Sequence, residues 1–380
     1  MHSIGWGDAA NTSRHDSAAS TWSARPPGTP AAAPSVHPAP AAPSFEKHER
    51  MSSTPYDMAE LQKETRMGAM GSETPAREIR RIGLADFDRR KAEIADQLWD
   101  ASVDVGFFQV ADHGIDLAEM RAAFAMTERF FALPDSVKAQ YPLKKALNSG
   151  WESRAQVRPS TGTPDQKESY QITRPHMDGL WPTEDELAGF RATMLAFEEK
   201  SWAVGMRLLS CFALKLGFDE AFFARAHDPS RPSYQSTLRM LHYYAIPPQE
   251  QRSPGLWRAG AHTDFDCLTL LYQRQGQGGL QVCPGKEMDA QEWTSIAPQE
   301  DLITCNIGDM LMRWSDDRLP SNFHRVRDPA AGEYRGPRYS LAFFCQANRD
   351  AVIESPSGEY PPITAGDYLN QRIAANFKKY

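Results

Sequence analysis

Residues 262–272 read HTDFDCLTLLY, a histidine and an aspartate followed by an apolar run. The run favours a buried β-strand, which puts His262 and Asp264 at one edge of a sheet. A further histidine, His324, lies in a second strand-like stretch. Two histidines and one carboxylate can occupy one face of an octahedral iron(II) and leave the opposite positions open. The pattern therefore predicts an iron(II) site in a β-rich fold.

A second motif follows the last of these histidines. Arg338 and Ser340 are two residues apart, and on a strand such side chains point the same way and can hold a carboxylate between them. The apolar residues 341–344 come next, which predicts that this strand is buried on both faces. A buried arginine requires an anion. An open iron beside a carboxylate clamp predicts activation of O2 with an organic acid as co-reactant.

Each signal has a plainer explanation when it stands alone. A single His-x-Asp is more often a surface polar pair, and His176-Met-Asp178 is a second copy in a loop-rich stretch. His324 by itself would more often be a structural histidine, and Arg338 could lie on an exposed edge strand. Their order and strand context together favour the copy at residue 262 as the metal motif.

Composition narrows the class of protein. The chain has 380 residues and a net charge of -7, which argues against an electrostatic footprint for nucleic acid. No apolar run approaches the length of a membrane span, and the N-terminus does not resemble a secretory signal. The five cysteines include no Cys-x-x-Cys pair, which favours reduced thiols in a cytoplasmic protein over disulfides or a zinc-thiolate site.

The chain divides into three predicted parts. Residues 1–74 form a disordered Ala/Pro/Ser-rich segment, because such a composition cannot bury an apolar face, and we expect residues 1–70 to be dispensable for catalysis. Residues 75–235 form a helical N-terminal region. Residues 236–380 hold short strand candidates between turn signals, Met310–Trp314 among them, which indicates a jelly-roll core. The expected fold class is α+β dominated by β.

The chain resembles a known family over roughly residues 77–375. Its motifs are similar to those of the iron(II)/2-oxoglutarate-dependent dioxygenases of the isopenicillin N synthase-like type. The similar stretches are GFFQVADHGI at 106–115, LHYY at 241–244, HTDF at 262–265, NIGDML at 306–311, HRV at 324–326 and RYS at 338–340. The resemblance implies a distorted double-stranded β-helix, or jelly roll, with flanking N-terminal helices.

The resemblance also implies roles for single residues. His262, Asp264 and His324 would ligate Fe(II). Arg338 and Ser340 would bind the distal carboxylate of 2-oxoglutarate, and Tyr244 would add a hydroxyl to it. No further catalytic residue is implied beyond the metal ligands.

The expected function is Fe(II)- and 2-oxoglutarate-dependent dioxygenation of a small organic molecule, with O2 consumed, succinate and CO2 released, and ascorbate as a candidate reductant. One alternative is an oxidase that does not use 2-oxoglutarate, or an ethylene-forming relative, and a more distant one is a non-catalytic jelly-roll binding protein. We expect no nucleic-acid or membrane partner. The sequence leaves the substrate and the oligomeric state open. Candidates for the substrate site are the loop 148–171, with Lys167, Glu168 and Tyr170, and the strand around Phe343 and Phe344.

Overall fold

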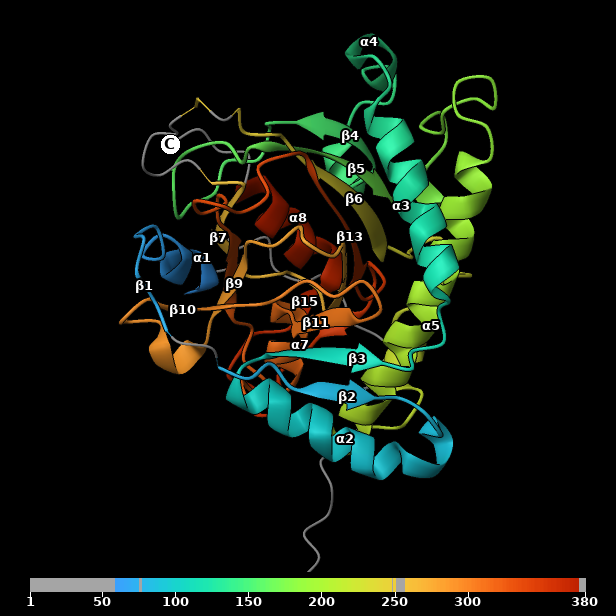
Figure 1. Ribbon diagram of the computed structural model, residues 1–380. Helices are drawn as coiled ribbons and strands as arrows, with labels where there is room; N and C mark the ends of the chain where they lie inside the picture. The colour runs from blue at the N-terminus through green and yellow to red at the C-terminus, as the bar shows by residue number, and fades with distance from the viewer. Residues whose placement is uncertain (1–58, 75–76, 248, 251–256, 376–380) are drawn as a thin grey trace, which may run out of the picture. The chain divides into compact units, whose positions relative to one another are not determined.

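Antiparallel strands dominate the centre of the computed structural model, which describes residues 59–74, 77–247, 249–250 and 257–375 (Figure 1). The larger sheet of the described residues has eight strands in the order β2 (Arg81–Gly83), β3 (Phe107–Ala111), β11 (Ile303–Ile307), β8 (Leu268–Gln273), β13 (Arg338–Cys345), β6 (Thr237–Tyr243), β5 (Lys167–Ile172) and β4 (Gly150–Ser153). The smaller has five, in the order β1 (Ser72–Glu73), β10 (Glu292–Ser295), β9 (Leu280–Cys283), β12 (Phe323–Val326) and β7 (Ala259–His262). A further pair joins β14 (Val352–Ile353) to β15 (Ile363–Thr364).

Helices surround these sheets. They are α1 (Ala59–Glu64), α2 (Phe87–Asp104), α3 (Leu117–Phe131), α4 (Asp135–Lys138), α5 (Phe190–Leu216), α6 (Phe222–Ala226), α7 (Asp309–Trp314) and α8 (Ala365–Ala375), with 3-10 turns η1 (Lys145–Leu147), η2 (Arg174–His176) and η3 (Gly285–Glu287). Helices α3 and α5 pack against β13 on one side of the larger sheet, and α2 packs against α5 and β3 (Figure 1). Among the described residues, no helix combines the length and apolarity that crossing a membrane requires.

Strand alternation separates two environments on the larger sheet. On β13, Leu341 and Phe343 belong to the apolar core beneath the helices. Their neighbours Ser340 and Ala342 line a cavity on the other face. The smaller sheet closes this cavity, because Leu280 and Val326 from it pack with Ala342. The space between the sheets is therefore reached by every second residue of each strand.

Helix α5 begins later than the capping signal in the sequence indicates and ends where the sequence predicts. Thr183 and Glu186 form the reciprocal hydrogen bonds of a capping box, as the sequence indicates. The long helix nevertheless begins only at Phe190, after Gly189 has turned with a φ of 75°. It ends at Gly217, whose φ of 76° is the left-handed conformation that favours glycine at a helix C-terminus.

Two predictions made from the sequence are wrong in the described part of the chain. Residues 309–314 form helix α7 rather than a strand, since Gly308 lies against the backbone of Asp266 and turns the chain away from the sheet. Residues 59–74 are ordered rather than disordered. They form α1 and β1, and Met67 is buried.

Tertiary contacts explain the order of residues 59–74, which their own composition does not predict. Strand β1 pairs with β10, and the buried Arg325 donates hydrogen bonds to the carbonyls of Ala69 and Met70. The predicted disorder of residues 1–58 lies outside the described residues. The helical and strand-rich parts, predicted as separate regions, fall within one unit.

Candidate active site

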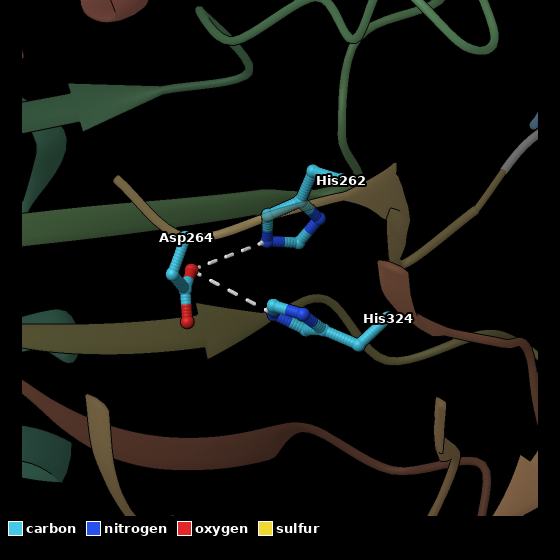
Figure 2. Close-up of side chains that lie close together, drawn as sticks. All are labelled: His262, Asp264 and His324. Carbon is cyan, nitrogen blue, oxygen red and sulfur yellow. Dashed lines mark ion pairs between the residues drawn. The ribbon is translucent and has the colours of Figure 1, made fainter. Parts of the chain in front are cut away.

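The predicted metal ligands meet where β7 and β12 run side by side. His262 ends β7 and is paired in register with His324 on β12, while Asp264 follows just beyond the strand. Figure 2 shows the three side chains converging. The Oδ1 atom of Asp264 lies 3.9 Å from Nε2 of His262 and 3.7 Å from Nε2 of His324. All three ligand atoms lie within 4.8 Å of one another, so one metal ion could contact all of them.

Hydrogen bonds on the far side of each ligand fix its orientation. Nδ1 of His262 lies 2.8 Å from the carbonyl of Gly260, which leaves Nε2 for a metal. Asp264 accepts hydrogen bonds through Oδ2 from Thr269 (2.6 Å) and Asn306 (2.8 Å), which leaves Oδ1 free to ligate. Burial holds the pKa of His262 well below its usual value, so its ring is neutral, as a metal ligand must be. This donor set fits iron(II).

A buried ionic cluster supports the loop between the ligands from behind. Arg372 of α8 donates to the Thr263 hydroxyl at 3.0 Å and lies 3.3 Å from Asp309 and 3.6 Å from Glu64 of α1. Tyr368 and Thr263 also donate to Asp309, at 3.1 and 3.2 Å. Sequence reasoning missed this cluster, because its members come from both ends of the fold and no local motif links them.

The predicted carboxylate clamp lines the same cavity as the metal ligands. Arg338 is 1 % exposed, and its Nε donates to the carbonyls of Gln277 and Gly278 at 3.1 and 3.0 Å. Its Nη1 lies 3.4 Å from the hydroxyl of Ser340. Among the described residues no carboxylate forms an ion pair with Arg338. Its buried positive charge therefore favours the binding of an anion.

The structure does not bring Tyr244 to this clamp. The Tyr244 hydroxyl is hydrogen-bonded to Ser153 at 2.8 Å, and its ring lies under the Arg154 guanidinium. Tyr243 instead lines the cavity and is paired in register with Arg338, whose Cζ lies 4.7 Å from the Tyr243 ring centre. The motif LHYY offers two tyrosines, and strand alternation from the inward-facing Leu241 is the signal that selects Tyr243.

The alternation of side chains along β5 also decides which of the candidate substrate-site residues in the loop-rich segment face the cavity. Lys167 of β5 lines the cavity, whereas Glu168 is directed to the opposite face, where it pairs with His242 at 2.8 Å. Tyr170 is buried in the apolar core. The second His-x-Asp copy begins at His176 on η2, and it is not part of the metal-ligand group found among the described residues.

A second buried network positions His262. Asp165 pairs with Arg158 at 2.9 Å and also with Lys167. Its other oxygen accepts the backbone N–H of Gly260 at 2.9 Å, and the Gly260 carbonyl in turn holds His262. Burial and the nearby Arg158 lower the pKa of Lys167 to about 8.

Comparison with known proteins identifies the family. Residues 235–347 match the model of the 2OG-Fe(II) oxygenase superfamily, and residues 79–187 match that of the non-haem dioxygenase in morphine synthesis N-terminal region. The chain is 33% identical over 300 residues to proline hydroxylase buaE of Petromyces alliaceus, covering 74% of this chain and 91% of that one. It is 32% identical over 308 residues to the 2-oxoglutarate-Fe(II) type oxidoreductase hxnY of Emericella nidulans, covering 73% and 83%.

A solved structure agrees with these relatives. A full-length Neurospora crassa protein in complex with alpha-KG, which is 2-oxoglutarate, matches with a TM-score of 0.70 and 31% identity, covering 78% of this chain and 96% of that one. The predicted jelly-roll fold, the enzyme class and the cofactors Fe(II) and 2-oxoglutarate are thereby confirmed. This chain belongs to the 2OG-Fe(II) oxygenase superfamily and is a 2-oxoglutarate-dependent non-haem iron dioxygenase.

Proposed function

We propose that His262, Asp264 and His324 hold the iron and that the enzyme oxidises a small organic molecule in the cavity between the two sheets. The observation that carries this proposal is that three converging ligand atoms share one cavity with a buried arginine that forms no ion pair among the described residues. When bound, iron(II) would activate O2 as the oxidant, and 2-oxoglutarate, as it is converted to succinate and CO2, would supply two of the four electrons that O2 takes up.

The protein's own residues bind, orient and exclude water. The Gly260 carbonyl and the Thr269 hydroxyl hold His262 and Asp264 in ligating orientations. Arg338 and Ser340 receive the distal carboxylate of 2-oxoglutarate, and Tyr243 takes the place expected for Tyr244. Apolar side chains of both sheets surround the reacting atoms, which keeps the oxidant from solvent.

The substrate class follows from the relatives only in outline. One relative carries the name proline hydroxylase, and the Neurospora crassa protein has also been solved with thymine. Proline and thymine are both small polar molecules, and we propose a small polar substrate for this enzyme. A cytoplasmic location is supported by five cysteines that are all buried and free of disulfides.

An anaerobic titration tests the metal assignment. Adding 2-oxoglutarate to the Fe(II)-loaded protein should produce the weak visible charge-transfer band of a chelated keto acid. His262→Ala should abolish this band and all succinate release, whereas His176→Ala should leave both unchanged. Loss of the band in His176→Ala and its survival in His262→Ala would show that the other His-x-Asp copy binds the metal.

A further inference from the structure

A second arginine faces the cavity at a distance from the clamp. Arg239 lies on β6 and lines the same cavity as Arg338. Residues 239, 241 and 243 alternate along this strand, so Arg239 shares its inward face with Leu241 and Tyr243. Figure 1 shows β6 beside β13, the strand that carries the clamp.

Arg239 has no carboxylate ion pair among the residues that the structure describes. Its Nε lacks a hydrogen-bond partner, and an Nη atom reaches only the amide oxygen of Asn148, at 3.4 Å. The Phe344 ring, 5.1 Å from its Cζ, supports it from one side. Burial lowers the pKa of Arg239 from its usual value. A charged group held in such surroundings requires an anion or a strong acceptor.

The carboxylate that acts most strongly on Arg239, Glu152, is engaged elsewhere through one oxygen, while its Oε2 has no hydrogen-bond partner among the described residues. Oε1 of Glu152 accepts hydrogen bonds from Ser169 at 2.9 Å, from Gln171 at 3.1 Å and from Gln156. Glu152 exerts an electrostatic attraction on Arg239 but forms neither an ion pair nor a hydrogen bond with it. Its negative charge therefore offsets Arg239 only through space.

The charges around the cavity do not balance even when the cofactors are present. Among the described residues, the lining includes one carboxylate, Asp264, and the cationic side chains of Arg158, Lys167, Arg239 and Arg338, while Glu152 lies near Arg239. Asp165, just behind the lining, pairs with both Arg158 and Lys167. The two positive charges of iron(II) equal the two negative charges of 2-oxoglutarate, so loading the cofactors leaves the excess positive charge unchanged.

Strand register separates Arg239 from the 2-oxoglutarate clamp. Arg338 is paired with Tyr243, whereas Arg239 is paired with Ala342. Four residues along a strand span about 13 Å. The metal lies toward the Arg239 end, because Thr269, the hydroxyl donor to Asp264, is paired with Phe344. A five-carbon acid held at Arg338 and the metal would leave Arg239 available for a different ligand.

A neighbouring amide provides an independent sign of a ligand site. Gln171 is fully buried on β5 and paired in register with Arg239. Its amino group donates to Glu152, which can only accept, so its orientation is determined. The remaining Oε1 atom of Gln171 has no hydrogen-bond partner within the described part of the chain. A buried acceptor left open beside a partly buried cation is costly unless a bound molecule satisfies it.

We propose that Arg239 binds a carboxylate group of the primary substrate, so that the enzyme acts on a small organic acid other than 2-oxoglutarate. This inference rests on the proposed function. The acid is held by Arg239 at one end of the cavity, and Gln171 accepts a hydrogen bond from an N–H or O–H group on it. The carbon to be oxidised lies toward the iron.

Matched pairs of probes test this substrate class. Protein loaded anaerobically with Fe(II) and 2-oxoglutarate is titrated with benzoate, phenylacetate and N-acetylglycine, and with the primary amide of each acid. The readouts are the change in the charge-transfer band and, after O2 is admitted, the probe-dependent release of succinate. The variants are Arg239→Gln, Arg239→Lys and a control, Arg207→Gln, in which an arginine that packs on Phe87 outside the cavity is replaced.

At least one acid should bind ten- to a hundredfold more tightly than its own amide, the range that a charge-assisted hydrogen bond provides. Arg239→Gln should bring acid and amide to parity without changing the 2-oxoglutarate titration, which also reports that the variant is folded. Arg239→Lys should retain part of the preference, and Arg207→Gln all of it.

Two results would overturn the inference while leaving the proposed function intact. In one, the 2-oxoglutarate band forms but no acid of the panel binds more tightly than its amide. In the other, the preference for an acid survives in Arg239→Gln. A wild-type protein that shows no band with Fe(II) and 2-oxoglutarate alone would instead contradict the proposed function itself.

Discussion

The front and the back of the metal centre are built in different ways. The front consists of His262, Asp264 and His324, whose side chains converge from two neighbouring strands and the residue just beyond one of them. The back is the buried cluster of Arg372, Asp309, Glu64, Thr263 and Tyr368, which joins helices from both ends of the described chain. The front holds the proposed metal ligands, and the back supports Thr263, which lies between two of them.

Metal ligands can be recognised in a sequence more readily than the ion pairs that support them. Metal ligands must have particular donor atoms, so few residue types can stand at those positions. A supporting ion pair needs only opposite charges that meet in space, and no local spacing records it. We therefore expect substitutions at the back to lower stability and substitutions at the front to change binding.

The largest expected effect is at the back. Arg372→Met removes the cation between Glu64 and Asp309, both of which are fully buried. At pH 8, where Glu64 is mostly ionised, leaving buried carboxylates without their partner should lower the free energy of unfolding by about 3–5 kcal/mol, measured by urea denaturation. The control is Arg89→Met, which breaks an exposed pair with Asp86 and should cost less than about 1 kcal/mol. Equal losses in the two variants would mean that the cluster does not stabilise the fold.

The same cluster predicts a pH dependence of stability. Burial raises the pKa of Glu64 from 4.5 to about 7. Between these values the folded protein keeps a proton that the unfolded chain has lost, so this group destabilises the fold as the pH rises through that window. The slope is at most about 1.4 kcal/mol per pH unit. Urea denaturation of Glu64→Gln from pH 4.5 to 7 should show a smaller decline than the wild type.

The pH dependence should be specific to Glu64. Glu220→Gln replaces an exposed glutamate outside the cluster and should follow the wild-type decline. If Glu64→Gln also follows it, Glu64 does not carry the proton. A chain that begins after Thr74 should also lose stability, because it lacks the pairing of β1 with β10 and the two carbonyls that Arg325 binds.

The sequence predicted the residues of the front and missed the supporting cluster at the back. His262, Asp264, His324 and Arg338 could be named because donor type, order and strand context agree. The structure places Tyr243 rather than the predicted Tyr244 beside Arg338, because the resemblance of the motif does not take account of the alternation of β6. Helix α7 was taken for a strand because a short, fully buried helix is as apolar as a buried strand.

The next effect is at the front and concerns the cofactor clamp. Arg338→Lys keeps the charge but loses the planar fork that matches a carboxylate. The KM for 2-oxoglutarate, measured by succinate release, should rise about ten- to a hundredfold, while binding of the primary substrate changes much less. Arg274→Lys, which alters an arginine paired with Glu128, should leave that KM unchanged. Turnover that persists without 2-oxoglutarate would point to the oxidase alternative.

The smallest expected effect decides between two adjacent tyrosines. Tyr243 faces Arg338 inside the cavity, whereas the hydroxyl of Tyr244 is bound to Ser153. A typical hydrogen bond contributes about 0.5–1.5 kcal/mol net, so loss of the hydroxyl in Tyr243→Phe should raise the KM for 2-oxoglutarate roughly two- to tenfold. Tyr244→Phe should leave this KM unchanged, because its hydroxyl is directed away from the cavity.

Tyr243→Phe and Tyr244→Phe serve as controls for each other. Both remove one hydroxyl from neighbouring residues at the end of the same strand, so a general loss of packing would affect them alike. A rise in KM only in Tyr244→Phe would require β6 to slip by one residue, which would also turn Arg239 and Leu241 out of the cavity. Strand alternation, rather than the sequence motif, thus fixes which side chains face the cofactor.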